Sequence, residues 1–174
     1  MILKIIKNEG PFSNIIISPS MSAQKIVLME DDEVLGKVLK EELTESGFSV
    51  AWAKDGEAGI AHVRKDKPDL VLLDILMPKK NGFDVLAEIK SSPATKDIPV
   101  IMLTMLGADD DLKRGLALGA NDYIVKSQHA IGEIRDKVKE FFKAEQHPEA
   151  RHMQEGADVS PHKELEKRAE KIKE

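Results

Sequence analysis

The sequence contains no cysteine, few aromatic residues and no long apolar run. Without cysteine the chain can form neither a disulfide nor a thiolate metal site, and a reducing compartment is the easier fit. Its apolar stretches fall well short of the roughly 20 residues that span a membrane. The N-terminal stretch 1–20 lacks the continuous apolar core and the cleavage site of a secretory signal. We therefore expect a cytoplasmic protein with no membrane partner.

An excess of positive charge is also missing. The chain has 26 Lys and Arg against 31 Asp and Glu, which gives a formal net charge of -5. This balance argues against direct binding of nucleic acid or of an anionic membrane surface. The 174 residues, of which 41% are hydrophobic and 33% charged, are enough for one globular domain with residues to spare.

Strand and helix patterns alternate five times between about residues 25 and 144. The strands are expected at residues 26–29, 48–52, 70–73, 100–103 and 123–125. The helices are expected to begin near Val34, Asp55, Gly82, Asp109 and Ile131. Short runs that are apolar on both faces are typical of a parallel sheet covered by helices on both sides. The pattern predicts an α/β fold, a flavodoxin-like five-stranded parallel sheet of order 2-1-3-4-5 with right-handed crossovers.

Two segments lie outside this alternation. Residues 1–22 fit no element of it, and Met21 leaves two readings equally open: an over-extended reading frame, or a flexible or weakly docked arm. Residues 146–174 begin as a polar linker, and their last part carries only a narrow apolar stripe, so a solvated tail fits it better than a short helix. We expect the domain to span residues 23–145, with no DNA-binding or enzymatic output domain in the short polar tail.

Polar residues follow the predicted strands at one edge of the sheet. Glu30 and Asp31 come after the first strand, Asp74 after the third, Thr104 after the fourth and Lys126 after the fifth. The ligand crevice of an open parallel sheet lies outside these carboxyl ends, between strands one and three. Asp74, which ends the apolar run "LVLLD", is therefore expected at the mouth of a site and not in a core.

These residue types suit one chemistry. Three crowded carboxylates (Glu30, Asp31 and Asp74) are unfavourable alone but suit Mg²⁺, a hard divalent cation. A carboxylate beside Mg²⁺ can attack phosphorus as a nucleophile, and a Lys ammonium and a Thr hydroxyl can bind the phosphoryl oxygens. Each residue alone has an ordinary structural explanation, such as Asp32 at a helix N-terminus. Their convergence on one edge favours a site.

Four stretches carry a resemblance to a known family: "KIVLMEDDE", "PDLVLLDILMPKKNGFDVL", "IPVIMLT" and "GANDYIVK". In order, spacing and residue type they resemble the receiver domain of bacterial response regulators, the phospho-acceptor of two-component signalling. The resemblance covers roughly 120 residues. It implies that Asp74 is the phosphorylated aspartate, that Asp31 binds Mg²⁺ directly and that Glu30 acts through water. The main-chain carbonyl of Leu76 is implied as a further metal ligand.

The resemblance also implies a switch and partners. Thr104 matches the hydroxyl that moves toward the phosphoryl group, Lys126 matches the lysine that contacts it, and Tyr123 matches the aromatic residue coupled to that threonine. The implied phosphoryl donor is a histidine kinase or a phosphotransfer protein. The output implied is an interaction with an unknown downstream protein through the face made by the fourth helix, fifth strand and fifth helix.

The sequence departs from the family pattern at two positions beside the site. Ser127 follows Lys126 where the family usually has proline after a cis peptide, which puts the loop geometry in doubt. Met105 follows Thr104 where the family usually has a small residue, so a long side chain stands near the acceptor. These departures keep open a second hypothesis, a docking module that works without phosphorylation.

A third hypothesis, a hydrolase that forms an aspartyl phosphate, is disfavoured. Such enzymes usually carry a second Asp two residues after the nucleophile, where this chain has Leu76. We therefore expect no enzymatic activity on an external substrate.

Trp52, the only tryptophan in the chain, ends the predicted second strand. This position leaves open whether Trp52 lies close enough to a bound metal ion to report it by fluorescence.

Overall fold

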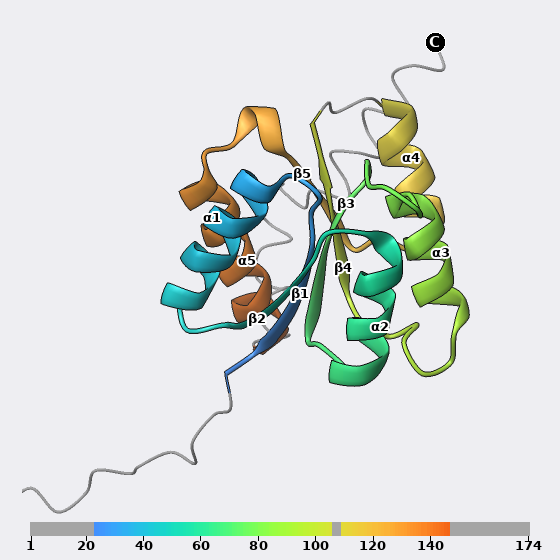
Figure 1. Ribbon diagram of the computed structural model, residues 1–174, viewed down its shortest axis with the longest axis horizontal. Coiled ribbons are helices and arrows are strands. Elements are labelled where there is room, and N and C mark those ends of the chain that lie inside the picture. The colour runs from blue at the N-terminus through green and yellow to red at the C-terminus, as the bar shows by residue number, and fades with distance from the viewer. Residues whose placement is uncertain (1–22, 106–108, 147–174) are drawn as a thin grey trace, which may run out of the picture.

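The computed structural model describes residues 23–105 and 109–146, which form a parallel sheet between two layers of helices (Figure 1). The elements in chain order are β1 (Lys25–Met29), α1 (Glu33–Glu45), β2 (Ser49–Ala53), α2 (Gly56–Asp66), β3 (Leu70–Asp74), α3 (Gly82–Ser91), β4 (Val100–Thr104), α4 (Asp109–Ala117), β5 (Asp122–Val125), the 3-10 turn η1 (Lys126–Gln128) and α5 (Ile131–Gln146). All strand pairs are parallel, in the order β2-β1-β3-β4-β5. The predicted fold class is therefore confirmed. The expectations for residues 1–22 and for the tail beyond 146 lie outside the described residues.

Alternate residues of each strand face opposite helical layers, as the two-residue period of a strand requires. Ile26 and Leu28 belong to an apolar cluster that includes residues of α1 and α5. Val27 and Met29 belong to a second cluster, with residues of α2 and α3. Figure 1 shows the same division, with α1 and α5 on one side of the sheet and α2, α3 and α4 on the other. Burial on both faces explains why the strands read as continuous apolar runs.

Side chains at the first turns fix where two helices begin. The Asp32 carboxylate accepts hydrogen bonds from the main-chain N–H groups of Val34 (2.9 Å) and Leu35 (3.0 Å), and so caps α1. Asp55 accepts from the N–H of Ala58 at 2.8 Å and caps α2, as predicted. Of the neighbouring acids in "EDD", Asp32 therefore serves the helix, which leaves two for the site.

The register of the sheet brings the ends of its strands to one level. Asp74 is the last residue of β3 and pairs with Leu103 of β4, while Thr104 is the last residue of β4 and pairs with Val125 of β5. The sequence placed Asp74 and Thr104 just beyond their strands, which is wrong by one residue. Because all strands run in one direction, their carboxyl ends share one edge of the sheet, and the candidate site lies there.

Candidate functional site

Lys126 lies at the centre of the polar residues at this edge. Its ammonium Nζ donates to both carboxylate oxygens of Glu30, at 2.9 and 3.1 Å, and to Oδ2 of Asp74 at 2.8 Å. All three side chains are buried. The chain thus brings β1, β3 and the end of β5 together through one cation. The negative charge of Asp74, the carboxylate that ends the apolar run "LVLLD", is compensated by the ammonium of Lys126.

The expectation of an open mouth around Asp74 is wrong for the side chain itself. Asp74 lies at the predicted edge, but only 4% of its surface is exposed. The physical reason is that Asp74 is still part of a central strand, hydrogen bonded into the sheet beside β4. Ion pairing with Lys126 offsets the cost of burying the Asp74 carboxylate, because an unpaired buried carboxylate would be strongly unfavourable.

Burial and the shared lysine shift the protonation of the cluster. Burial raises the pKa of Glu30 to about 7; the hydrogen bond from Lys126 opposes this rise and the charge of Asp74 adds to it. Burial acts to lower the pKa of Lys126, but its hydrogen bonds to Asp74 and Glu30 outweigh burial and raise that pKa. Lys126 therefore stays an ammonium, and the charge of the Glu30 carboxyl changes near neutral pH.

Three carboxyl groups approach closely enough to share a cation. One oxygen each from Glu30, Asp31 and Asp74 lies within 4.8 Å of the others. Asp31 is exposed, whereas the other two are buried, so the cluster opens to solvent on the side of Asp31. Hard oxygen ligands of this kind suit Mg²⁺. Leu76, a residue with 70% of its surface exposed, lies beside them, and its N–H lies 3.4 Å from Oδ1 of Asp74.

The two predicted switch residues lie on neighbouring strands. Thr104 is buried at the end of β4. Tyr123, on β5, is also buried, and its hydroxyl donates to the main-chain carbonyl of Asp111 in α4 at 2.6 Å. Burial raises the pKa of Tyr123 to about 12. A methyl group on Gly115 of α4 would collide with the Tyr123 hydroxyl, so the ring lies directly against that helix.

The two departures from the family pattern contact each other. No cis peptide bond occurs among the described residues, so the Lys126–Ser127 peptide is trans. Ser127 lies in η1, and its hydroxyl donates to the main-chain carbonyl of Met105 at 2.7 Å. Met105 has 52% of its surface exposed. A side-chain hydrogen bond thus connects the loop after β5 to the residue that follows Thr104.

Two residues that the sequence did not assign to the site contact it. A Cβ atom on Gly82, the first residue of α3, would collide with the main-chain carbonyl of Asp74 and lie 2.8 Å from Cα of Ile75. The Gly82 N–H also donates to the Ile75 carbonyl at 2.8 Å. The sequence marked Gly82 only as a helix start; its place in "KKNGF" carried no signal of this close approach.

Trp52 is the second such residue. Its indole N–H donates to the main-chain carbonyl of Glu30 at 2.9 Å. Trp52 therefore contacts the main chain of a candidate metal residue, and that its fluorescence reports a bound metal ion stays a prediction. No sequence pattern around an aromatic residue near a strand end predicts a hydrogen bond from its ring to the main chain of the neighbouring strand.

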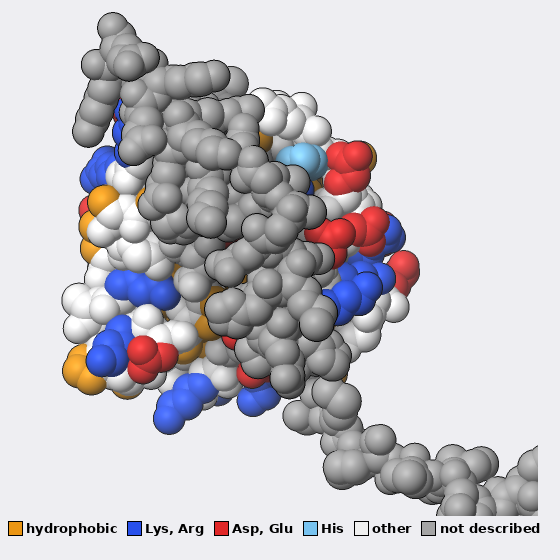
Figure 2. Space-filling model, turned by 180° about the vertical axis from the view of Figure 1, so that it is seen from behind, with side chains coloured by type: hydrophobic (Ala, Val, Ile, Leu, Met, Phe, Trp, Pro, Cys, Tyr) orange, Lys and Arg blue, Asp and Glu red, His pale blue; other side chains and the backbone are white. Residues whose placement is uncertain are grey.

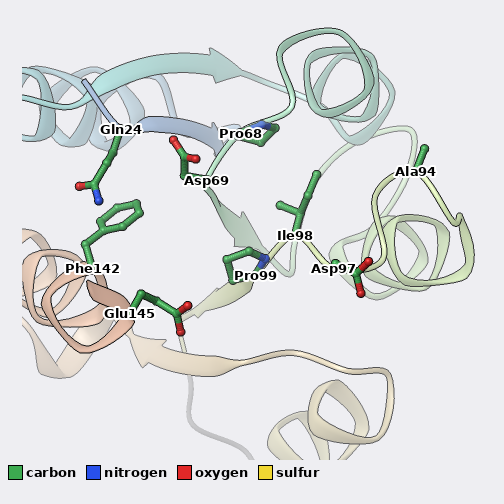
Figure 3. Close-up of a pocket in the computed structure, with 9 residues that line it drawn as sticks. All are labelled: Gln24, Pro68, Asp69, Ala94, Asp97, Ile98, Pro99, Phe142 and Glu145. Atoms are coloured by element: carbon green, nitrogen blue, oxygen red, sulfur yellow. The ribbon is translucent and has the colours of Figure 1, made fainter. Parts of the chain in front are cut away.

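A pocket of about 420 Å³ lies at the opposite edge of the sheet, away from these residues (Figure 3). Its lining includes Asp69 and Pro99, which precede β3 and β4, and Phe142 of α5. None of the predicted site residues lines it.

On the described part of the face in Figure 2, Lys and Arg side chains lie among Asp and Glu side chains, so both signs of charge occur there. Among the described residues, no helix is both long and apolar enough to cross a bilayer.

Comparison with known proteins identifies the fold family. The family model of the response regulator receiver domain matches residues 26–139, more than half of the chain. The chain belongs to the response regulator receiver domain family. The resemblance to the receiver domain of response regulators that the sequence motifs indicated is therefore confirmed.

Several known proteins are similar to the receiver span of this chain. The transcriptional regulatory protein CpxR of Klebsiella pneumoniae is 49% identical over 102 residues, which cover 59% of this chain and 42% of CpxR. The chain thus matches less than half the length of this curated relative. The Mn²⁺-bound response regulator Rcp1 is 32% identical with a TM-score of 0.62, over 68% of this chain and 94% of Rcp1. The phosphorylated cyanobacterial phytochrome response regulator RcpA is 34% identical with a TM-score of 0.61, over 70% of this chain and 93% of RcpA.

Proposed function

We propose that this receiver accepts a phosphoryl group on Asp74 in the presence of Mg²⁺, and that the modification changes its affinity for a downstream protein. The observation that carries the proposal is the ammonium of Lys126 held between Glu30 and Asp74, with Asp31 beside them. The implied donor is a histidine kinase or a phosphotransfer protein. Apart from this phosphoryl donor, we expect no external substrate, because the receiver is modified on its own side chain.

The donor set fits Mg²⁺. When fully ionised, the three carboxylates and the Lys126 ammonium leave two negative charges, which one divalent cation would offset. Asp31 and Asp74 would bind the ion directly, Glu30 through water, and Leu76 through its main-chain carbonyl. When bound, Mg²⁺ supplies positive charge beside the incoming phosphoryl oxygens. The metal-bound and phosphorylated relatives Rcp1 and RcpA support the assignment.

The transfer is a displacement at phosphorus. A carboxylate oxygen of Asp74 forms a bond to phosphorus, and the bond from phosphorus to the donor atom breaks, so the electron pair leaves with the donor. Lys126 then donates hydrogen bonds to the phosphoryl oxygens in place of the lost carboxylate charge. The Thr104 hydroxyl, at the end of the adjacent strand, is the second donor to these oxygens.

The new charge supplies the signal. An acyl phosphate brings a charge near -2 to the sheet edge. A Thr104 that binds this group more strongly in one conformation shifts the population toward that conformation. Tyr123 connects this change to α4 through its hydrogen bond to Asp111. The face built by α4, β5 and α5 would then present different contacts to its protein partner.

Acetyl phosphate with Mg²⁺ tests the proposal. Intact-mass spectrometry should show one added phosphoryl group on the wild-type protein and none on Asp74→Asn. A matched control is Asp97→Asn, which removes an exposed acid at the opposite edge of the sheet and should label like the wild type. Equal labelling of Asp74→Asn would refute the acceptor assignment, and no labelling of the wild type would favour the docking module that works without phosphorylation.

A further inference from the structure

Trp52 completes the main-chain hydrogen bonding of the residue before Asp31. The pairing of β1 with β2 ends at Met29 and Ala53. One residue further on, the Glu30 N–H still donates to the Ala53 carbonyl at 3.0 Å. The Glu30 carbonyl lies beyond the ladder, and the indole N–H of Trp52 donates to it at 2.9 Å. The indole N–H of Trp52 therefore supplies the hydrogen bond that the main-chain N–H of a further β2 residue would otherwise have donated.

Helix α1 leaves room for this indole at one position. A Cβ atom on Gly36 would lie 2.6 Å from Nε1 of Trp52 and closer still to two carbons of its ring. Real side chains cannot approach so closely, so any larger residue at position 36 would displace the ring. Glycine is less favourable than alanine inside a helix, yet it lies within the second turn of α1. The glycine is explained by the indole that it accommodates.

A cation also contacts the ring. Nζ of Lys54 lies 5.3 Å from the centroid of the Trp52 ring, within the range of a cation–π contact. The same ammonium lies 2.7 Å from a carboxylate oxygen of Glu33, the first residue of α1. The indole is thus held by three groups around the loop that carries Glu30 and Asp31: a main-chain carbonyl, a glycine surface and a lysine.

We propose that Trp52 is a positioning residue for the metal site, acting on Asp31 through the Glu30–Asp31 peptide. The Glu30 carbonyl and the Asp31 N–H belong to one planar unit, so the hydrogen bond from Trp52 restrains the peptide plane from which Asp31 extends. Among the described residues, no hydrogen bond or ion pair holds the exposed Asp31 carboxylate. Its placement beside Glu30 and Asp74 therefore depends on its main chain. The inference rests on the proposed role of Asp31 as a Mg²⁺ ligand.

Calorimetric titration of the full chain with Mg²⁺ tests this role. Trp52→Phe keeps an aromatic ring but removes the donor, and should weaken Mg²⁺ binding by roughly three- to tenfold, the effect of one net hydrogen bond. The matched control is Val50→Ala, on the same strand and packed in the same apolar cluster. It should lower the thermal stability without changing the Mg²⁺ affinity. Gly36→Ala, which displaces the indole but keeps it in the chain, should weaken binding like Trp52→Phe.

Nuclear magnetic resonance gives a reading that does not need the metal. The HN–Hα coupling of Asp31 depends on its backbone angle and not on the ring current of residue 52, so this coupling should change in Trp52→Phe and stay constant in Val50→Ala. If wild-type protein binds Mg²⁺ and Trp52→Phe binds it equally well, the positioning role is refuted. If the wild type binds no Mg²⁺, the proposed function fails and the metal role of Trp52 fails with it; an Asp31 coupling that is unchanged in Trp52→Phe would show in addition that Trp52 does not orient Asp31.

Discussion

Lys126 determines the electrostatics of the site because it is the common partner of two buried carboxyl groups. Its ammonium contacts Glu30 and Asp74 within hydrogen-bonding distance. Glu30 is nonetheless so buried that its pKa rises to about 7. One lysine therefore compensates the buried Glu30 carboxylate only partly. This incomplete compensation gives the site room for further positive charge.

Glu30 should make the protein less stable as pH rises toward neutrality in the absence of Mg²⁺. Because the pKa of Glu30 is raised from 4.5 to about 7, the folded protein holds a proton that the unfolded chain has lost between these values. Its contribution to the free energy of unfolding is complete below about pH 4.5 and is lost as pH rises to about 7. In urea unfolding with EDTA, the free energy of unfolding of Glu30→Gln should rise relative to that of the wild type by on the order of 3 kcal/mol across this pH window. Parallel pH profiles for the two proteins would contradict the assignment.

Gly82 should matter more than its place at a helix start suggests. Gly82→Ala would push a methyl group into the main chain of Asp74 and Ile75, and should cost about 1–3 kcal/mol of stability and reduce labelling by acetyl phosphate. The matched control is Gly132→Ala in α5, where the new methyl would come no closer than 3.5 Å to the Arg135 side chain. That change should leave both stability and labelling intact. Equal behaviour of the two variants would show that the close approach at Gly82 is unimportant.

At the scale of elements, Asp55 joins the start of α2 to the loop after β3. One carboxylate oxygen accepts from the Ala58 N–H at 2.8 Å and the other contacts Nζ of Lys79 at 2.7 Å. Lys79 has a positive φ of 64°, an uncommon conformation for a residue other than glycine. The same loop carries Leu76, so the cap of one helix also restrains a loop beside the acceptor.

Asp55→Ala should therefore destabilise the fold by about 1 kcal/mol, the usual effect of losing an N-cap. Glu57→Ala is the matched control, because Glu57 is an exposed acid in the first turn of the same helix. It removes only a favourable interaction with the helix dipole and should cost a few tenths of a kcal/mol. Thermal unfolding followed by circular dichroism separates the two. A Glu57→Ala loss as large as that of Asp55→Ala would argue against the cap.

The sequence predicted the elements well because their signals are local. The apolar runs marked all five strands, and Asp55 marked a cap. The convergence of Glu30, Asp74 and Lys126 could be predicted once the strands were taken as parallel. The burial of Asp74 could not, because it depends on how neighbouring strands flank it. The contact of Trp52 with Glu30 joins residues 22 positions apart, and no periodic pattern records such a contact.

At the scale of the whole molecule, the residues of the two apolar clusters and of the candidate site come from the same stretch of the chain. The clusters contain residues from Ile26 to Phe142, and the site residues lie between Glu30 and Lys126. We therefore propose that residues 23–145 form the folding unit. A parallel sheet needs both helical layers, since each face would otherwise expose apolar surface to water.

A fragment of residues 23–146 should accordingly fold and accept a phosphoryl group like the full chain. A shorter fragment, 23–130, lacks α5 and with it Ile134, Val138 and Phe142, which are buried against one face of the sheet. It should not fold. Circular dichroism and intact mass after acetyl phosphate treatment distinguish the two. An unfolded 23–146 fragment would show that residues outside this span are required.

The central claim is that Asp74 carries the phosphoryl group, and chemical trapping of the acyl phosphate tests it most directly. After treatment with acetyl phosphate and Mg²⁺, borohydride reduces an aspartyl phosphate to homoserine, which peptide sequencing by mass spectrometry locates in the chain. Homoserine should appear at position 74, and none should appear when EDTA replaces Mg²⁺. Homoserine at a different aspartate, with Asp74 unmodified, would contradict it.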